Sequence, residues 1–314
     1  MPDPHNPVPS HPEIDDLIAN PEMEIPLADL PRIFQVTRLT FVCKRPPDVD
    51  TGIRLPSAVR GALGPQLAAV ARDRADPPDR PTALQVIYGD HGILDRHSRV
   101  AKPYVIWCRA EGGRIFVEIS LFGEAGLWRD DVIEAFARVM LPRARGGEGG
   151  ISLDGVSRAR RPWPIEDIYW RERQGYPVPK ARNSFLMSFV TPLVLGNREM
   201  QRGEPWRMFS TLLIRLGGLA RWHRADVPEL RSFDEIEALC TTVRSEPVLP
   251  PKAAMYRRKS RSFGDMEKFE TGILGSFLVR DYPRELWPAI VLGTLTNCGY
   301  DVPQGAGRYV ISDP

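Results

Sequence analysis

The chain has 314 residues, of which 42% are hydrophobic and 26% charged, as in globular proteins of one large domain or two ordinary ones. Its formal net charge of +2 excludes an overall polycation, and no apolar run approaches the roughly 18 residues that a membrane helix needs. The wide spacing of the cysteines excludes a disulfide framework and a zinc site. We therefore expect reduced, buried thiols, and no metal or cofactor, at Cys43, Cys108, Cys240 and Cys298.

Residues 1–32 are expected to be a disordered tail followed by a lead-in. Residues 1–12 contain five prolines and no apolar run, so no secretory signal is expected and the protein is predicted to be cytoplasmic. The range from Ile14 to Leu30 is compatible with a short helix that is interrupted at Pro21, Pro26 and Pro31.

The first half of the chain predicts a strand, a helix, a hairpin, a second helix and a last strand. Apolar and polar residues alternate from Phe34 to Cys43, as in a half-buried strand, and helical spacing follows over residues 54–73. Next come a hairpin at residues 102–109 and 114–122, an amphipathic helix at 130–141, a glycine loop at 143–150 and a strand at 151–156. This order is that of a ferredoxin-like βαββαβ unit.

The same order returns after residues 158–182, which are rich in Arg, Trp and Pro and are predicted to be a linker. Strands are expected at residues 184–195, 248–262, 271–280 and 308–311, with helices at 206–222 and before the turn at Asn297. A helix at 233–243 is an insertion, and a second glycine loop, QGAGR, precedes the last strand. The repeat predicts an α+β protein with two tandem ferredoxin-like domains, at residues 33–157 and 183–314.

The stretch KAAMYRRKSR, residues 252–261, has five basic residues and no acidic one, and it falls on a predicted strand. Alternation along a strand places Arg257, Lys259 and Arg261 on one face. Such a row of cations suits the phosphates of an RNA hairpin, and it also suits an ordinary solvated face. On the first interpretation the RNA contacts are Lys252, Tyr256, Arg257, Arg258, Lys259 and Arg261.

The two glycine loops are places where backbone N–H groups can face an anion. Arg308 directly follows the second loop, within reach of a phosphate lodged at Gly305 and Gly307. Arg143 and Arg145 flank the first loop in the same way. The alternative, given equal weight, is that the glycines only allow a tight return of the chain to the sheet.

Four motifs resemble those of a known family. They are LPSAVRGALG at residues 55–64, IFVEISLFGEA at 115–125, GILGSFLV at 272–279 and QGAGRYVI at 304–311. In this order and spacing they resemble the RAMP proteins of CRISPR systems, and most closely the CRISPR-associated protein six family, from about Phe34 to Ile311.

The resemblance implies a metal-independent endoribonuclease that binds CRISPR repeat stem-loops and cuts precursor CRISPR RNA into guide RNA. In that chemistry the ribose 2′-hydroxyl attacks the adjacent phosphate, which requires a base, an acid, and cations for the phosphorane. The implied partners are repeat RNA, mature guide RNA and, as a further candidate, other Cas effector subunits; no cofactor and no membrane are implied. The alternatives are a non-catalytic RAMP subunit that positions guide RNA, and a scaffold without a role in RNA.

Family members often carry a histidine between the first strand and the first helix, but residues 34–72 of this chain contain none. The candidates in that stretch are cationic instead: Lys44, Arg45, Arg54 and Arg60.

Each candidate for catalysis has an alternative role. Arg60 is predicted either to contact a phosphate in a cleft between the halves or to form a salt bridge on the helix surface. Arg54 lies near the positive end of the same helix. His91 and His97 follow that helix and are candidates for proton transfer if the segment folds over the cleft, or else surface loop histidines. His223, at the end of a helix in the second half, is predicted to be structural.

Overall fold

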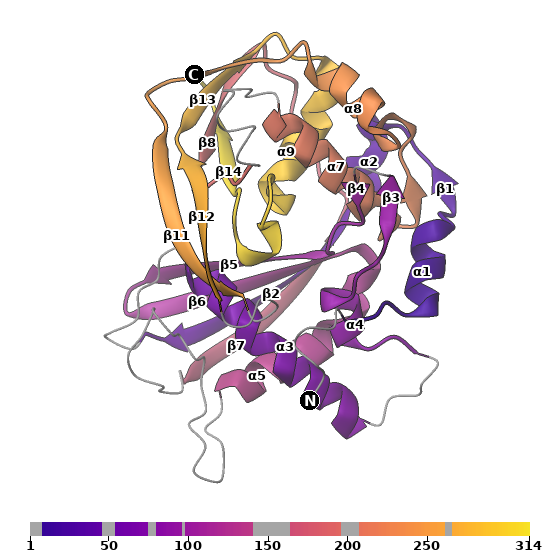
Figure 1. Cartoon of the computed structure of the whole chain (residues 1–314), viewed down its shortest axis with the longest axis vertical. Coiled ribbons are helices and arrows are strands. Elements are labelled where there is room, and N and C mark those ends of the chain that lie inside the picture. Colours follow the sequence, from indigo (N-terminus) through magenta and orange to yellow (C-terminus); the bar gives the residue numbers. More distant parts are fainter. Residues whose placement is uncertain are drawn as a thin grey trace.

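The computed structural model describes residues 8–45, 54–74, 80–95, 98–140, 164–195, 207–260 and 266–314. These residues form a lower and an upper half in Figure 1, each built around an antiparallel sheet of four strands. Every helix within these ranges is too short or too polar to cross a membrane.

The first sheet contains, in spatial order, β5 (Tyr104–Glu111), β6 (Arg114–Phe122), β2 (Gln35–Lys44) and β7 (Ile165–Gln174), and every neighbouring pair is antiparallel. Helices α3 (Arg54–Arg74) and α5 (Arg129–Met140) cover one face of this sheet (Figure 1). Side chains alternate along β2, and Phe41 packs against Phe136 of α5 with ring centroids 3.9 Å apart. Arg38 therefore lies on the opposite face, away from the helices.

The second sheet repeats this arrangement with β10 (Arg244–Pro247), β13 (Ser276–Arg280), β8 (Ser184–Phe189) and β14 (Tyr309–Ser312). Its helices are α7 (Arg207–Arg221) and α9 (Trp287–Thr296), and α8 (Phe233–Cys240) is the expected insertion, which begins at a capping box on Ser232. In both sheets the strands of a unit lie in the order second, third, first, fourth, which is the ferredoxin-like order. The predicted α+β class with two βαββαβ units is confirmed.

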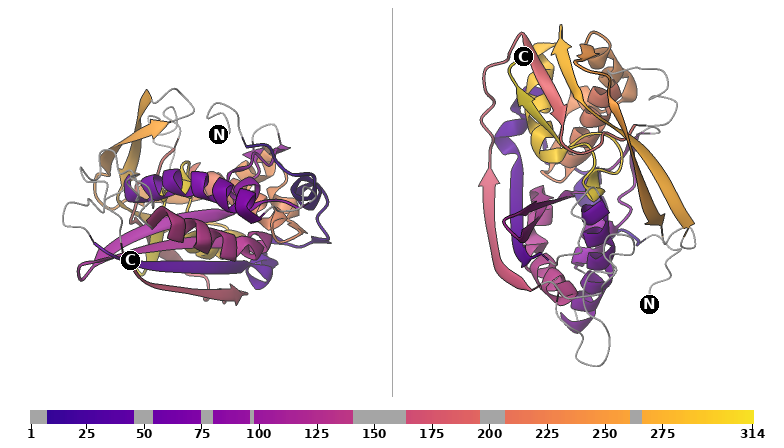
Figure 2. Two further views of the ribbon diagram at one scale, coloured as in Figure 1. Left: turned by 90° about the horizontal axis from the view of Figure 1, so that it is seen from below. Right: turned by 90° about the vertical axis from the view of Figure 1, so that its left-hand side faces the viewer.

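The basic stretch of the second half lies on a ribbon outside both sheets, which corrects the predicted sheet strand at 248–262. Within the described ranges β11 (Lys252–Ser260) pairs with β12 (Met266–Leu274) alone, whereas β10 takes the place in the sheet. Pro250 and Pro251 carry no backbone N–H, so the ladder is interrupted between β10 and β11. The ribbon runs from the upper half down beside α3 (Figures 1 and 2).

One strand of the first sheet lies where a linker was expected. β7 falls inside residues 158–182 and pairs with β2 from Gln35 to Cys43. The strand expected at 151–156 lies outside the described residues. The fourth strand of the first unit is therefore β7, and the chain between it and β8 is the stretch from 175 to 183.

The N-terminal segment packs against the rest of the chain, which corrects the disorder expected for residues 8–12: Val8 accepts a hydrogen bond from the Asp90 amide at 3.1 Å, and the Ser10 hydroxyl bonds to His91 at 3.2 Å. His11 caps α1 (Pro12–Ala19), accepting a hydrogen bond from the Glu13 amide at 3.3 Å. The segment continues through β1 (Met23–Glu24), a 3-10 helix (Leu27–Asp29) and α2 (Leu30–Ile33). β1 pairs in parallel with β9 (Ala225–Asp226), which fastens this segment to the second half. Burial of apolar residues such as Ile14 and Leu30 stabilises it there.

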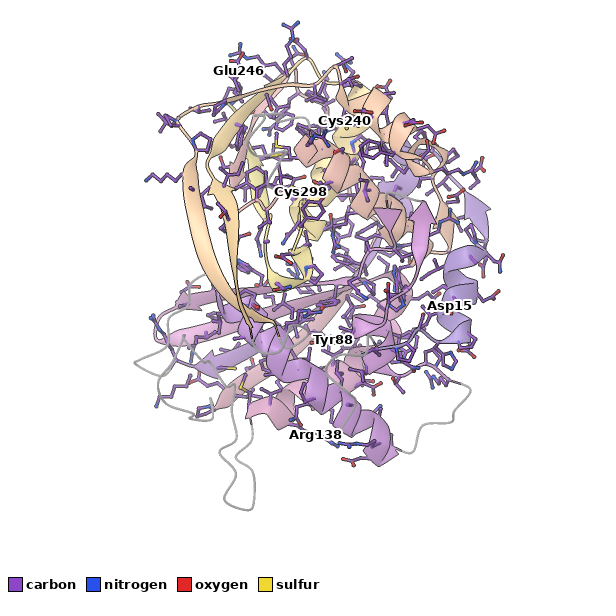
Figure 3. The ribbon with its side chains drawn as sticks, in the orientation of Figure 1. Asp15, Tyr88, Arg138, Cys240, Glu246 and Cys298 are labelled. Atoms are coloured by element: carbon purple, nitrogen blue, oxygen red, sulfur yellow. The ribbon has the colours of Figure 1, made fainter. Side chains whose placement is uncertain are left out.

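The remaining elements are short connections. They are α4 (Ala83–Tyr88), β3 (Ile93–Asp95), β4 (Ser98–Arg99) and 3-10 helices at Gly123–Trp128, Pro228–Leu230, Arg284–Leu286 and Val302–Gln304. The four cysteines are free and buried, as expected, and Figure 3 shows Cys240 and Cys298 inside the upper half.

The two halves share one continuous hydrophobic core. Gly123, at φ +56°, lies so close to the second half that a Cβ there would come within 2.0 Å of the Trp222 carbonyl oxygen. Arg215 of α7 is buried and donates to the carbonyl of Thr296 at 2.8 Å and to that of Tyr104, on β5, at 3.2 Å. The relative position of the halves is therefore fixed by close backbone contacts and buried hydrogen bonds.

Candidate nucleic-acid interface

The face of the first sheet opposite its helices carries cations and aromatic rings. The register places Arg38 opposite Ser120 on β6 and Arg171 on β7, and neighbouring pairs add further side chains to the same face. Arg109 lies over the ring of Phe116, with its guanidinium carbon 4.0 Å from the ring centroid. We call this surface the arginine face and define it as Arg38, Trp107, Arg109, Phe116, Tyr169, Arg171, Arg173 and Arg308.

Arg308 reaches the arginine face from the other half of the molecule. It precedes β14, and its guanidinium carbon lies 3.6 Å from the centroid of the Trp107 ring. Burial lowers the pKa of Arg308, and the nearby cations Arg38 and Arg109 lower it further, while Glu118 opposes them. An additional negative charge at this point would relieve the repulsion between the cations.

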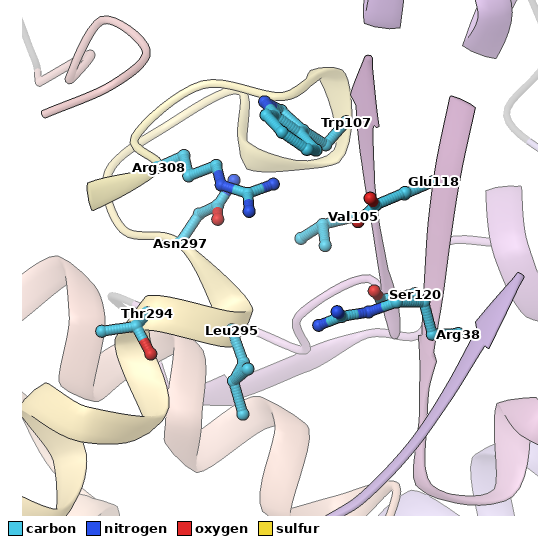
Figure 4. A pocket seen from close by; sticks show the side chains of 9 residues that line it. All are labelled: Arg38, Val105, Trp107, Glu118, Ser120, Thr294, Leu295, Asn297 and Arg308. Carbon is cyan, nitrogen blue, oxygen red and sulfur yellow. The ribbon is translucent and has the colours of Figure 1, made fainter. Parts of the chain in front are cut away.

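A small pocket lies where Arg308 meets the first sheet (Figure 4). Side chains from β2, β5, β6, α9 and the loop before β14 line it: Arg38, Val105, Trp107, Glu118, Ser120, Thr294, Leu295, Asn297 and Arg308. Glu118 lies 3.9 Å from Arg109, but within the described part of the chain neither Arg38 nor Arg308 has a carboxylate at ion-pair distance. Two arginines without a carboxylate partner and one stacked indole are the groups that bind a phosphate and a base.

The backbone of Asn297 is strained beside this pocket. Its φ of 61° and ψ of 176° belong to a region that is ordinarily restricted to glycine. The conformation is held by hydrogen bonds from its amide N–H to Gly293 at 2.9 Å and from its side chain to the Ala306 carbonyl at 3.1 Å. This backbone conformation of Asn297 turns the chain from the end of α9 into the loop that carries Arg308.

The second glycine loop is a turn, as the alternative from the sequence had it, because its amides already have acceptors. The amides of Gly305, Gly307 and Arg308 donate to Val302, to Pro192 and to the Thr191 hydroxyl, each at 2.9 Å. Gly305 packs against the first half, where a Cβ would lie 2.9 Å from both Pro56 and the Ile106 carbonyl oxygen. These amides are therefore not oriented toward a bound phosphate.

Arg60 is held between two tyrosines on the inner side of α3. Its Nε donates to the Tyr104 hydroxyl at 2.8 Å, and its guanidinium carbon lies 4.8 Å from the centroid of the Tyr88 ring. Tyr104 raises the pKa of Arg60 and keeps the guanidinium charged, while burial opposes it. In the same helix, Ser57 donates to Gln304 of the second half at 3.2 Å. Arg60 therefore lies near the junction of the two halves and does not form a surface salt bridge with any carboxylate of the described residues.

His91 lies in the core, so the interpretation as a surface loop histidine is wrong. It is 4% exposed, its Nε2 bonds to the Val86 carbonyl at 2.9 Å, and its Nδ1 to the Ser10 hydroxyl at 3.2 Å. Burial lowers the pKa of His91 to about 4. A neutral, enclosed imidazole is poorly placed for proton transfer to RNA.

His223 is structural, as expected. Its Nε2 accepts the Gln35 amide proton at 2.8 Å, its Nδ1 lies 2.8 Å from the Leu219 carbonyl, and its ring stacks on Phe34. Burial lowers the pKa of His223. The residue joins the start of β2 to the end of α7.

The other residues predicted from the sequence lie at the end of the first sheet or on the ribbon. Lys44 and Arg45 are exposed where β2 ends, and Arg54 is the first residue of α3. Lys252 is exposed at the start of β11, and the same strand holds residues 256–259. The remaining predicted residues, His97, Arg143, Arg145 and Arg261, lie outside the described ranges. Across the described ranges, no group of His, Cys, Asp or Glu side chains is arranged to hold a metal ion.

Sequence reasoning missed most of the arginine face. Arg38 interrupts the apolar pattern of a predicted strand, and Arg171 and Arg173 stood in a supposed linker. The available signal was a cation at an alternate position of a strand, but only the register shows that these cations share one face.

Neither a family model nor a curated protein matches the chain. Among solved structures, a Cas6 product complex has 15% identity and a TM-score of 0.50, covering 89% of this chain and 100% of its own. A second Cas6 product complex has 14% identity and a TM-score of 0.48, covering 90% and 100%. Cas6 of Thermus thermophilus has 16% identity and a TM-score of 0.46, covering 89% and 98%. At such identities a likeness shows the fold, and the chain therefore has the tandem ferredoxin-like fold of the Cas6 proteins.

Proposed function

We propose that the protein binds CRISPR repeat RNA and cleaves it as an endoribonuclease that produces guide RNA. The observation that carries the proposal is the arginine face, where three arginines that pair with no carboxylate of the described residues, Arg38, Arg171 and Arg308, adjoin exposed or half-exposed aromatic rings. The Cas6 fold supports the assignment to repeat RNA, because the matched Cas6 structure with a TM-score of 0.50 is a product complex.

RNA binding uses both kinds of side chain on this face. Arg38, Arg171 and Arg308 neutralise phosphates, and each neutralised phosphate of a single strand contributes about 0.7 to the slope of log affinity against log salt concentration. Trp107 and Tyr169 offer rings on which unpaired bases stack. The ribbon formed by β11 and β12, with its run of basic residues, would receive the stem of the repeat.

Cleavage would take place at the junction of β2, α3 and the ribbon. Arg60, held charged by Tyr104, is suited to stabilise the phosphorane but not to remove a proton. Lys44 and Arg45 would add cations at the other end of β2, beside the turn between β5 and β6, and Arg54 stands at the start of α3. Holding the 2′-hydroxyl in line with the phosphate would contribute a large part of the rate. The product would stay bound and serve other Cas effector subunits as guide RNA.

A second candidate function is that of a non-catalytic subunit that binds and positions guide RNA. The non-catalytic function is favoured because the described histidines are already buried or hydrogen-bonded. His91 and His11 are buried, and both ring nitrogens of His223 are hydrogen-bonded. The two candidates share the RNA-binding surfaces and differ only in the chemical step.

The test is incubation of the protein with its own repeat RNA in EDTA, beside a copy with a 2′-deoxy residue at the cut site. Cleavage of the first RNA alone supports the endoribonuclease. Tight binding without cleavage of either RNA overturns the nuclease and leaves the binding subunit. Absence of specific binding overturns both.

The division of roles is tested by substitution within the same assay. Arg60→Ala should slow cleavage more than it weakens binding, because Arg60 is assigned to the phosphorane. Charge reversal at Arg257 and Lys259 should do the opposite, because the ribbon is assigned to the stem. Equal effects of both substitutions on cleavage and on binding would contradict this division.

A further inference from the structure

Among the described residues, the strand β7 is an open edge of the first sheet. It pairs there with β2 alone, and Figure 2 shows it at the outer border of the lower half in both views. Its residues are exposed along its length except for Ile165 and Ile168, which are half-buried. The backbone N–H and C=O groups on its outer side are therefore available to another strand.

Two large aromatic side chains stand at the centre of this edge. Tyr169 is 48% exposed on the arginine face, and Trp170 is 46% exposed on the helix side of the sheet. Arg129 of α5 lies over the Trp170 ring, with its guanidinium carbon 4.4 Å from the centroid, and so holds the indole at the edge. An edge strand with apolar groups on both faces gains free energy when a further strand covers it.

The charges on β7 are arranged symmetrically around Tyr169. Asp167 precedes it by two positions and Arg171 follows it by two, so all three lie on the same face. Asp167 accepts a hydrogen bond from the adjacent Ile168 amide at 2.8 Å, and no described residue of the chain forms an ion pair with Asp167 or with Arg171. Charges on an edge strand usually prevent pairing, but this order is complementary to a second copy of itself.

We propose that β7 pairs with β7 of a second copy of this chain, antiparallel and centred on Tyr169. In that register each Asp167 lies opposite Arg171 of the other copy, which gives two ion pairs on the arginine face. On the helix side each Ile168 lies opposite Trp170 of the other copy. The two four-stranded sheets then become one continuous sheet.

The like charges that this register brings together already have hydrogen-bonding partners within each chain. Glu166 lies opposite Glu172 of the other copy, but Glu166 already pairs with the Nε of Arg114 at 2.6 Å, and Glu172 accepts a hydrogen bond from Gln35. A two-fold axis perpendicular to the sheet places both arginine faces on the same side. The proposed dimer does not depend on the proposed RNA function, because association of the two copies is measured in the absence of RNA.

The register is tested by a disulfide at the symmetry axis. All four native cysteines are buried, so Tyr169→Cys introduces an accessible thiol that lies opposite its own copy in the dimer. Mild oxidation of this variant should give a covalent dimer on a non-reducing gel. Arg173→Cys is the matched control on the same face, because its two thiols would lie roughly 26 Å apart and should not link.

The ion pairs are tested by exchanging the charges. Arg171→Asp and Asp167→Arg should each raise the dimer dissociation constant about tenfold or more, because each creates two like-charge pairs. The double variant should restore the dissociation constant to within about threefold of that of the wild type. Light scattering and sedimentation at low salt measure these values, and circular dichroism checks the fold.

Three results would overturn the proposal. They are a wild-type monomer throughout the micromolar range, a double variant as weak as the single variants, and equal linking of the Arg173→Cys and Tyr169→Cys proteins. The first of these would leave the edge to a strand from a different protein.

Discussion

Arg308 is prepared for an anion by its surroundings. The indole of Trp107 covers one side of the guanidinium. Arg38 and Arg109 lie nearby, and Glu118 opposes their effect on Arg308, while Arg109 also pairs with Glu111. Stacking fixes the plane of the guanidinium and leaves its N–H edges free for a planar, two-pronged contact with a phosphate. The position of the Arg308 guanidinium therefore depends on Trp107 as much as on the loop before β14.

Substitution of Trp107 tests this dependence. Trp107→Ala removes the platform for Arg308 and a ring for base stacking, and should weaken RNA binding by about 1–3 kcal/mol, or roughly 5- to 150-fold. Trp107→Phe should retain most of the affinity, because an aromatic face remains. Fluorescence anisotropy with labelled repeat RNA measures both. Wild-type affinity of the alanine variant would contradict the stacking role.

The buried position of His91 predicts how the stability of the protein depends on pH. Burial, with Lys102 as the second cause, lowers the pKa of His91 to about 4 in the folded protein, against 6.5 for a free histidine. The unfolded chain therefore binds the proton more tightly, and stability is lost as pH falls from about 6.5 toward 4. The shift corresponds to a loss on the order of 3 kcal/mol.

The measurement is urea unfolding between pH 7.5 and 4.5 for the wild type and for His91→Gln. Glutamine can keep hydrogen bonds to the Val86 carbonyl and Ser10 but does not titrate. The pH dependence of the variant should be shallower than that of the wild type below pH 6.5. Identical slopes would show that His91 does not bind its proton more weakly in the folded state.

At the scale of elements, the second glycine loop is a joint between the halves, and Gly307 is its most constrained residue. Its φ is +70°, and a Cβ would lie 1.6 Å from the Cys298 carbonyl oxygen. Gly307→Ala should therefore cost more than about 2 kcal/mol of unfolding free energy. Gly61→Ala is the matched control: its Cβ meets nothing within 4 Å in helix α3, and it should stabilise the protein by up to about 1 kcal/mol. Thermal melts of both variants measure these changes in stability. A small destabilisation by Gly307→Ala would contradict the close packing around Gly307.

The ribbon formed by β11 and β12 belongs to neither four-stranded sheet, but its base is joined to the second half by two backbone hydrogen bonds of 2.9 Å between Ile273 and Leu193. Ala254 lies opposite Gly272 just beyond this bridge, so an Asn-Gly turn can replace residues 255–271 and leave the base in place. The shortened protein should keep both sheets, bind single-stranded repeat RNA normally and bind the stem-loop about tenfold or more weakly. Binding assays with the two RNAs separate the surfaces, and an equal loss for both would contradict the assignment of the stem to the ribbon.

Elements with a strong period were predictable from the sequence, and elements on the edges were not. The strand β2, the helices α3 and α5 and the hairpin of β5 and β6 bury one face, so their apolar residues recur at regular spacing. β7 is exposed on both faces and shows no such spacing, which is why it was assigned to a linker. The sequence predicted a sheet strand over residues 248–262. Pro250 and Pro251 interrupt the ladder between β10 and β11, and this effect is visible only in the three-dimensional structure.

The candidate site was only partly predictable for the same reason. Arg308 and the basic ribbon stand out as local patterns, and both were identified. Arg38, Arg109 and Arg171 come from three strands distant in the chain, and only their register brings them to one face. The interior position of His91 depends on the N-terminal segment, since Ser10 bonds to its ring.

At the scale of the whole molecule, the two halves act as one unit. The core is continuous, and the junction is crossed by Arg215, His223 and the glycine loop. Because Arg308 comes from the second half and Arg38 from the first, the pocket between them exists only while the halves remain packed together. RNA binding on the arginine face should therefore be lost together with tertiary structure, in a single cooperative transition.

The most direct measurement is the salt dependence of repeat RNA binding by Arg38→Ala/Arg308→Ala. The control is Arg72→Ala/Arg138→Ala, which removes the same charge from α3 and α5, on the helix side of the sheet. The first variant should bind about tenfold or more weakly, with a slope of log affinity against log salt reduced by about 1.5, while the control stays within about twofold of the wild type. Equal losses in both variants, or an unchanged slope in the first, would contradict RNA binding at the arginine face.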